Sequence, residues 1–272
     1  MTPRKILLLP VYNEAETVIG VIIRAEPFVD QILVVDDGST DTTRQLLETY
    51  ALQHDTLFFV SHRTNLGMSG ALITGFSILW DGFTRGRIAP DDIIITMDSD
   101  GQHEAGDIPH LIAPILNDSV ALSLGKRSFR AYPWVKRVGN FGLTRWARLW
   151  SGYPYRDVEC GFRAMKMAVV ADILPYFDPL YYGCAQELAV LVARRGWTIR
   201  NDVPIASDRY RSGTRIRHGW NNAMAAVRAW RRVRRGRRVA TRRGWTTEEW
   251  LPYDEGSYAR HYRREESQPG SR

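Results

Sequence analysis

The sequence predicts an α/β protein whose mostly parallel sheet is covered by helices on both faces. Through residues 5–124, short apolar runs alternate with longer segments whose apolar residues recur at helical spacing. Strands that alternate with helices in this way pair in parallel, with the helices packed on both faces of the sheet. The runs end repeatedly in acidic or polar residues, at the carboxyl edge where open α/β sheets bind their ligands.

Five strands are expected in the first half of the chain, each a short apolar run bounded by polar or turn-forming residues. They cover residues 5–9, 31–35, 57–61, 93–97 and 120–124. Their largely apolar composition is typical of strands that are buried on both faces. No G-x-G-x-x-G motif follows the first strand, which disfavours a standard dinucleotide-binding site.

Helices are expected between these strands from their apolar spacing and capping residues. Asn13 and Glu16 form a capping pattern before the first helix, and Ser39 or Asp41 caps the second. The third, over residues 70–79, is rich in small side chains and should therefore pack closely against the sheet. The apolar faces of the first two helices are expected at Val18, Ile19, Ile22 and Ile23, and at Leu46, Leu47, Tyr50 and Ala51.

Beyond the fifth strand the alternation of strands and helices loosens. We expect a helix near residues 137–150 and either a hairpin or edge strands over residues 157–166. A further helix over residues 186–195 ends before Gly196, the residue type usual just past a helix end, and residues 197–203 form the last strand.

Composition is that of a globular protein with one large domain. The 272 residues are 44% hydrophobic and 25% charged, which excludes collagen-like, coiled-coil and wholly disordered chains. Cys160 and Cys184 lack the spacing of a zinc site or a disulfide framework, so a reducing cytoplasm is expected. The sequence predicts neither a secretory signal nor a transmembrane helix.

Positive charge is concentrated near the carboxyl terminus. The net charge is +7, and residues 215–243 contain eleven arginines and no acidic residue. Trp220, Met224, Val227 and Trp230 recur at helical spacing among these arginines, which predicts an amphipathic basic helix that binds an anionic membrane surface. We therefore divide the chain into a catalytic domain (1–214), this helix (215–244) and a polar, flexible tail (245–272).

Asp98 and Asp100 follow the fourth strand directly. In an extended segment alternate side chains point to the same side, so both carboxylates should face one ligand. Two carboxylate groups suit a hard divalent cation that takes its remaining ligands from water and substrate phosphates. An isolated Asp-x-Asp is weak evidence, because a surface turn or a helix cap is the more common explanation.

Several motifs, in order, resemble family 2 glycosyltransferases of the GT-A fold. They are residues 10–14 (PVYNE), 36–41 (DDGSTD), 65–67 (NLG) and 98–103 (DSDGQH). Residues 125–127 (GKR), 160–163 (CGFR), 203–205 (VPI) and 210–215 (YRSGTR) resemble more narrowly the dolichol- and polyprenyl-phosphate mannosyltransferase branch. The resemblance covers about residues 5–215 and implies an inverting, metal-dependent hexosyltransferase.

The resemblance also implies the roles of individual residues. A nucleotide-sugar donor would contact Pro10, Tyr12, Glu14, Asp36, Asp37 and Asp98. Mg²⁺ or Mn²⁺ on its diphosphate would be held by Asp98, Asp100 and Gln102. Residues expected to act on the reacting groups are Asp100, Arg127, Arg137, Glu187 and Arg211, with Arg209 as an alternative to Arg211.

Two acceptors remain open. Polyprenyl phosphate is already ionised at neutral pH, so it needs positioning arginines and no strong base. A hydroxyl acceptor, such as a glycan or small metabolite, needs a general base, for which Glu187 is the candidate. Residue 186 is Gln where hydroxyl-glycosylating relatives often carry an acid, and this favours the phosphate acceptor.

Other functional classes are weaker alternatives. A receiver-like signalling domain would explain the acidic pair Asp36 and Asp37, but such a domain is about half this length. A nucleic-acid binder would explain the arginine cluster, but no nucleic-acid-binding motif accompanies the charge, so nucleic acid is disfavoured as a partner. The sequence leaves open whether a separate membrane-anchoring subunit takes part.

Overall fold

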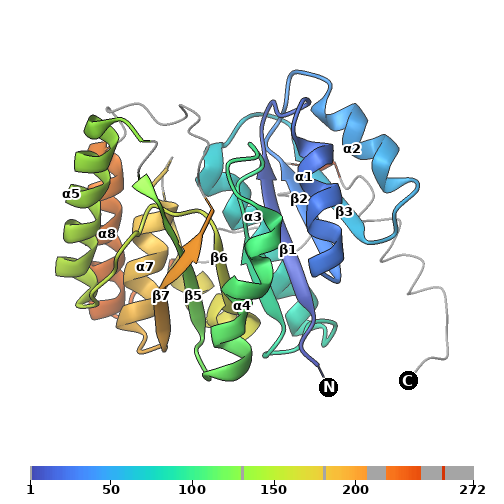
Figure 1. The fold of residues 1–272 in the computed structure, drawn as a ribbon. Coiled ribbons are helices and arrows are strands. Elements are labelled where there is room, and N and C mark those ends of the chain that lie inside the picture. The colour runs from blue at the N-terminus through green and yellow to red at the C-terminus, as the bar shows by residue number, and fades with distance from the viewer. Residues whose placement is uncertain (1, 130–131, 180–181, 207–218, 240–252, 255–272) are drawn as a thin grey trace.

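One eight-stranded sheet runs through the computed structural model, which describes residues 2–129, 132–179, 182–206, 219–239 and 253–254 (Figure 1). The strand order is β7-β5-β6-β4-β1-β2-β3-β8. The strands are β1 (Lys5–Val11), β2 (Gln31–Asp36), β3 (Leu57–His62), β4 (Ile93–Thr96), β5 (Leu122–Arg127), β6 (Arg163–Lys166), β7 (Ile199–Ile205) and β8 (Tyr253–Asp254).

Eight α-helices and three short 3-10 helices accompany the strands in the described part of the chain. The α-helices are α1 (Val18–Ala25), α2 (Thr43–Ala51), α3 (Gly67–Thr84), α4 (Ile108–Asn117), α5 (Trp134–Ser151), α6 (Met167–Ile173), α7 (Cys184–Arg194) and α8 (Gly219–Arg234). The 3-10 helices are η1 (Glu26–Phe28), η2 (Ala105–Asp107) and η4 (Leu174–Tyr176).

The parallel centre of the sheet confirms the predicted fold class. β1 pairs in parallel with β2 and β4, and β2 pairs in parallel with β3. In this register Val11 lies opposite Asp36, and Leu8 lies opposite Thr96. The carboxyl ends of β1, β2 and β4 therefore meet at one edge of the sheet.

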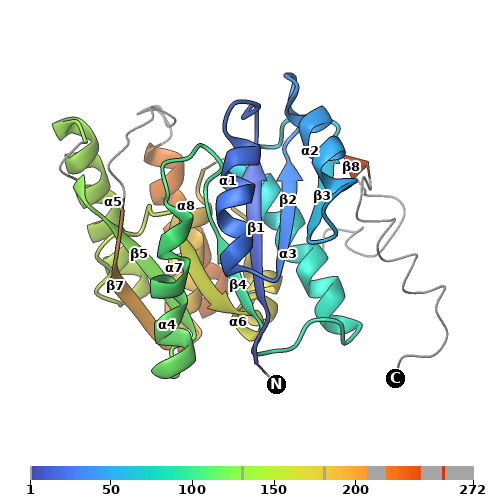
Figure 2. The same ribbon diagram turned by 45° about the vertical axis from the view of Figure 1, so that its right-hand side comes forward.

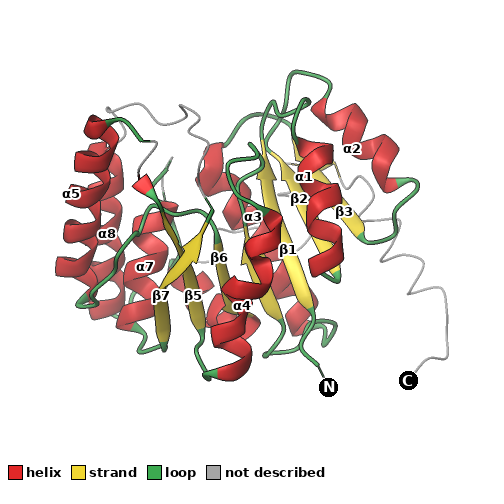
Figure 3. Cartoon of the chain, in the orientation of Figure 1, coloured by secondary structure: helices red, strands yellow, loops and turns green. Residues whose placement is uncertain are grey.

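Helices cover both faces of the sheet, as Figure 3 shows. Leu7 and Leu9 of β1 pack in a cluster with α1, α2 and α4, whereas Ile6 and Leu8 pack in a cluster with α3, α6 and α7. This alternation follows from the two-residue period of a strand. Because they are buried on both faces, β1, β2 and β4 consist mostly of apolar residues.

The β6 strand differs from its predicted place. The sequence predicts a hairpin or edge strands over residues 157–166, but β6 lies inside the sheet, antiparallel to both β4 and β5. β7 occupies the edge instead, parallel to β5. Residues 157–162 consequently run along the carboxyl edge of the sheet immediately before β6.

The start of α1 and one residue of its expected apolar face differ from expectation, whereas Asp41 accepts a hydrogen bond at the start of α2 as expected. α1 begins at Val18, and Asn13 does not cap it because it has a positive φ of 53° and accepts a hydrogen bond from the Thr40 amide. On α1 the buried residues are Val18, Val21, Ile22 and Ala25, so Ile23 is exposed. α2 begins at Thr43, whose amide donates to Asp41.

The basic helix α8 packs into the protein. Ala225, Ala226 and Ala229 are fully buried, and α8 lies against α5 and α7 (Figure 2). Trp146 of α5 donates its indole N–H to the Ala223 carbonyl, and Trp230 packs on Trp150. The apolar side of α8 is thus occupied by contacts within the protein. Trp220 lies where only the backbone is described.

Two residues of the carboxyl-terminal tail lie in the sheet. Tyr253 and Asp254 form β8, which pairs antiparallel with His62 and Ser61 of β3. The rest of the tail predicted to be flexible, and residues 207–218, lie outside the described residues. Within the described segments, no helix is both long enough and apolar enough to cross a bilayer.

Close packing of α3 against the sheet was predicted from its small residues and is confirmed at Gly75. A Cβ atom at this position would lie 2.3 Å from Cδ1 of Leu8 on β1. Leu8 is itself completely buried, so it has no room to move away.

We therefore expect Gly75→Ala to lower the free energy of unfolding by about 1–3 kcal/mol, the usual cost of overpacking a core. Urea unfolding followed by circular dichroism would measure the change. Gly106→Ala is the matched control, because a Cβ at Gly106 meets nothing within 4 Å. Equal stability of the two variants would contradict the packing argument.

Candidate active site

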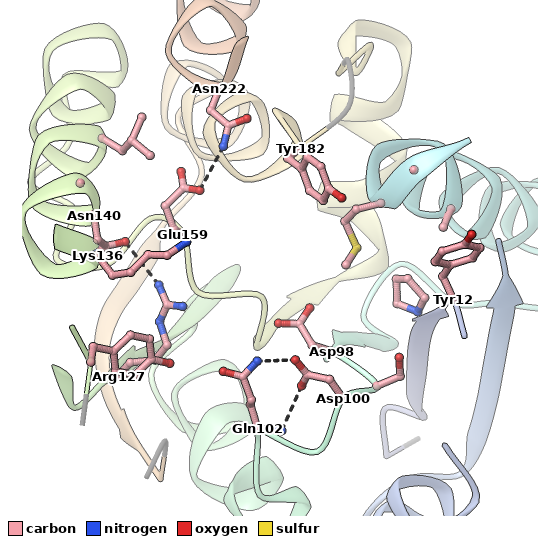
Figure 4. A pocket seen from close by; sticks show the side chains of 18 of the residues that line it. Tyr12, Asp98, Asp100, Gln102, Arg127, Lys136, Asn140, Glu159, Tyr182 and Asn222 are labelled. Atoms are coloured by element: carbon pink, nitrogen blue, oxygen red, sulfur yellow. Dashed lines mark hydrogen bonds between the residues drawn. The ribbon is translucent and has the colours of Figure 1, made fainter. Parts of the chain in front are cut away.

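A cleft of about 970 Å³ opens at the carboxyl edge of the sheet and extends to α5 and α8 (Figure 4). Its lining brings together segments that are far apart in the sequence. Among the predicted site residues, those that line it are Pro10, Tyr12, Glu14, Asp37, Asp98, Asp100, Gln102 and Arg127.

Asp98 is held at the floor of the cleft by His103 and Gly161. His103 contacts the Asp98 carboxylate through Nε2 at 3.2 Å. Burial opposes ionisation of Asp98, but this hydrogen bond and the charges of His103, Arg127 and Arg163 outweigh it, so the pKa of Asp98 lies below its usual range. A Cβ on Gly161 would lie 2.6 Å from both carboxylate oxygens of Asp98. Any larger residue there would displace Asp98.

The Asp100 side chain is held by hydrogen bonds from Gln102. The Gln102 amide donates to Oδ1 of Asp100 at 3.0 Å, and its side-chain nitrogen donates to Oδ2. Burial and the negative charge of Asp98 raise the pKa of Asp100. Gln102 therefore orients Asp100 and lines the cleft beside it, and its predicted role as a direct metal ligand stays a prediction.

The donor set fits a divalent cation shared with a substrate. No group of three or more His, Cys, Asp or Glu side chains that could hold a metal occurs among the residues described. Asp98 and Asp100 supply two hard carboxylate groups beside an open cleft, and Mg²⁺ is usually bound through one or two carboxylates together with substrate phosphates and water. The residues present therefore fit a cation that arrives with a diphosphate.

The pair Asp36 and Asp37 stabilises the two loops beside the cleft. Asp37 accepts hydrogen bonds from the Leu66 and Gly67 amides at 2.8 and 2.7 Å, at the start of α3, and contacts His62 at 2.7 Å. Asp36 accepts from the Ser39 amide and does not line the cleft. Both carboxylates are buried, but only Asp37 also lines the cleft. Of the two, only Asp37 can therefore contact a ligand there.

Arg127 lies across the cleft from the acid pair. Asp157 binds its guanidinium through two hydrogen bonds of 2.8 and 2.9 Å, and Asn140 of α5 accepts a third at 3.3 Å. Burial lowers the pKa of Arg127, but the hydrogen bonds to Asp157 and its negative charge outweigh this and raise the pKa further, so the group stays charged. Asp157 and Asn140 therefore position a permanent cation beside the cleft.

Besides Asp36, two predicted site residues do not line the cleft, and a third lies outside the described part of the chain. Arg137 is exposed on α5, whereas its neighbour Lys136 lines the cleft. Glu187 is fully buried, where it pairs with Arg232 of α8 and accepts from the Asp178 amide. Arg211, like Arg209, lies outside the described residues. The packing of α5 and α7 decides the first two positions, and sequence spacing does not reveal it.

Glu159 is a cleft residue that the sequence patterns did not identify. Its carboxylate accepts hydrogen bonds from Gln186 at 2.5 Å and Asn222 at 3.5 Å, and burial raises its pKa. Figure 4 shows its carboxylate beside Asn222, at the side of the cavity across from Asp98. The only available sequence signal was its place directly before the motif at residues 160–163.

Comparison with known proteins identifies a family. The model of "Glycosyl transferase family 2" matches residues 6–174. A UDP-N-acetylglucosamine–dolichyl-phosphate N-acetylglucosaminyltransferase of Methanococcus voltae is 30% identical over 217 residues, which are 73% of this chain and 83% of the relative. The polyprenol monophosphomannose synthase of Mycolicibacterium smegmatis is 30% identical over 241 residues, 84% of this chain and 87% of that protein.

Solved structures share the fold. Glucosyl-3-phosphoglycerate synthase from Mycobacterium tuberculosis, in complex with Mn²⁺ and UDP-glucose, superposes with a TM-score of 0.60 at 20% identity, covering 84% of this chain and 79% of that one. The predicted GT-A fold is thereby confirmed, together with its α/β sheet.

The opposite pKa shifts of the two acids predict a pH-dependent affinity for Mn²⁺. Ligating carboxylates must be ionised, and Asp100, whose pKa is raised, takes up a proton at a higher pH than an ordinary aspartate. Mn²⁺ affinity should therefore weaken as the pH falls through the raised pKa of Asp100, at a pH where Asp98 is still ionised. Mn²⁺ titration by electron paramagnetic resonance would test this, and an affinity independent of pH would contradict it.

Proposed function

We propose that this chain, which belongs to glycosyl transferase family 2, moves a hexose from a nucleotide-sugar donor to polyprenyl phosphate at the cytoplasmic surface of a membrane. The observation that carries this proposal is that one side of the cleft is lined by two acidic side chains and the other side by two basic ones. Asp98 and Asp100 line one side, and Arg127 and Lys136 line the other. The names of the two relatives, each a transferase with a lipid-phosphate acceptor, support the same acceptor here.

The donor occupies the side of the cleft formed by the carboxyl edge of the sheet. Tyr12, Glu14 and Asp37 would contact the nucleoside, and Asp98 and Asp100 would hold Mg²⁺ or Mn²⁺ on the diphosphate. When bound, such a cation neutralises the charge that develops on the leaving nucleoside diphosphate. The donor could be GDP-mannose or a UDP-sugar, and the Mn²⁺ and UDP-glucose in the solved structure of similar fold support this class.

The acceptor occupies the side of the cleft formed by α5. A phosphate oxygen attacks the anomeric carbon, the bond from that carbon to the diphosphate breaks, and the configuration inverts in this single displacement. The acceptor oxygen is already ionised, so the protein has only to position it. Arg127, held rigid by Asp157, and Lys136 supply the positive charge for this purpose.

A hydroxyl acceptor is the second candidate, and one observation favours it. Such an acceptor needs a general base, and Glu187 is enclosed with Arg232 away from the cleft. Glu159, however, is a carboxylate that lines the cleft. If the acceptor is a glycan or a small metabolite, Glu159 replaces Glu187 as the candidate base.

A membrane-facing surface is presented by α5. Trp134, Val138, Phe141 and Leu149 lie on one side of this helix and are each more than 60% exposed. The helix carries four basic residues and no acidic one. Exposed apolar side chains flanked by positive charge fit an anionic phospholipid surface, into which the rings insert while the cations meet the headgroups.

This position differs from the one predicted for the membrane contact. The apolar residues of α8 are largely buried against α5 and α7. Only the basic side of α8 is therefore available for contact with a membrane. α5 forms the outer edge of the molecule in Figure 1, and its other side lines the cleft. A lipid phosphate could thus reach Arg127 from the bilayer without leaving it.

Activity is the first test of the proposal. UDP- and GDP-sugars are offered with a short polyprenyl phosphate and Mn²⁺, and lipid-linked sugar is measured. Asp100→Asn should reduce transfer by at least about 100-fold, because an ionised carboxylate on the metal is lost. Asp55→Asn, on the surface, is the matched control. Undiminished transfer with excess EDTA would refute the metal's role, and product on hydroxyl acceptors alone would favour the second candidate.

Membrane binding is tested by co-sedimentation with liposomes of phosphatidylcholine and phosphatidylglycerol. Replacing Trp134 and Phe141 by Ser should weaken binding at least about tenfold, because burying one such side chain contributes about 1.5–3 kcal/mol. Leu52→Ser is the control, since Leu52 is 68% exposed at the end of α2. Unchanged co-sedimentation of the double variant would show that α5 is not the membrane contact.

A further inference from the structure

We infer that Glu159 and Asn222 form the subsite that binds the hydroxyl groups of the transferred sugar and selects the donor by them. This inference rests on the proposed function, because it assumes a nucleotide-sugar ligand. It assigns a role to two cleft residues that neither the metal nor the phosphates require.

The first support is the position of Glu159 within residues 157–162. Val158, Cys160 and Phe162 are completely buried, Val158 in the cluster with α3, α6 and α7 and the other two in the cluster with α1, α2 and α4. The intervening residues contact the site: Asp157 binds Arg127, Glu159 lines the cleft, and Gly161 lies against Asp98. Glu159 therefore sits between the residue that positions the acceptor cation and the residue that abuts the acid pair.

The second support is the way the Glu159 carboxylate is held. Gln186 of α7 and Asn222 of α8 each donate a side-chain N–H to it, at 2.5 and 3.5 Å, one to each oxygen. Each carboxylate oxygen can accept a further hydrogen bond. The buried Oδ1 of Asn222 has no hydrogen-bond partner among the described residues. The subsite is thus rich in acceptors and requires a ligand with several donors.

Sugar hydroxyl groups supply such donors, whereas a phosphate does not. An ionised phosphate carries only acceptor oxygens at its exposed end, so it would be repelled by Glu159 and attracted by Arg127 and Lys136. In the proposed function, Tyr12 contacts the nucleoside and Asp98 and Asp100 hold the metal on the diphosphate. These residues lie across the cavity from Glu159 in Figure 4. The hexose between diphosphate and acceptor is the remaining part of the substrates, and Glu159 faces it.

The experiment measures ligand binding by isothermal titration calorimetry with Mn²⁺. Wild type is titrated with UDP-glucose, UDP-N-acetylglucosamine and GDP-mannose, and with UDP and GDP. Glu159→Gln keeps the size of the side chain and replaces one acceptor by a donor. We expect it to weaken the sugar nucleotide by about 10- to 100-fold and to change the free diphosphate by less than about twofold. Glu104→Gln, exposed and outside the cleft, is the matched control.

Monodeoxy analogues of the bound donor identify the hydroxyl groups. Wild type should bind at least one deoxy analogue more weakly than it binds the parent donor. Glu159→Gln should bind the same analogue as tightly as the parent donor, since this variant already lacks the hydrogen bond to that hydroxyl group. Asn222→Ala should act in the same direction, and thermal unfolding of each variant confirms that it is folded.

Three outcomes would overturn the inference. Equal binding of the sugar nucleotide by wild type and Glu159→Gln removes the subsite while leaving the proposed function intact. Unchanged donor binding with loss of kcat identifies Glu159 as a general base. Wild type that binds none of the sugar nucleotides contradicts the proposed function itself, and the subsite with it.

Discussion

The approach of Gly161 to the Asp98 carboxylate is the contact on which both halves of the cleft depend. The segment before β6 can pass this close only because residue 161 has no side chain. The buried Arg163 side chain holds this segment in place by donating hydrogen bonds to the Val158 and Cys160 carbonyls at 2.7 and 2.8 Å. One short stretch of chain thereby places the acid pair, Glu159 and the Asp157 that orients Arg127.

Charge is divided across the cleft in a way that suits two phosphorylated substrates. The hydrogen bond from His103 and the nearby cations keep Asp98 ionised, whereas burial and Asp98 itself make Asp100 easier to protonate. A cation that arrives with a diphosphate would relieve the repulsion between these two acids. On the opposite side Arg127 is compensated by Asp157, which prevents an isolated buried charge and lets the guanidinium remain in place.

The helices α5, α7 and α8 join the cleft to the surface of the molecule. α8 packs its alanines against the other two, and its Arg232 neutralises Glu187 in the interior of this group. α5 in turn has one side in the cleft and an apolar side exposed. The same helix can therefore contact both an acceptor phosphate and the bilayer in which its lipid chain is dissolved.

The sequence by itself determined the parallel sheet and the acidic carboxyl edge. Strand periodicity is local, and parallel strands necessarily end at one edge, so residue order alone is enough to group Asp37, Asp98 and Asp100. Tertiary structure alone decided which side of each helix meets the cleft. It placed Lys136 there in place of Arg137, enclosed Glu187 with Arg232, and brought Glu159 beside Asn222. These positions depend on packing between segments remote in the chain, and residue spacing carries no information about such contacts.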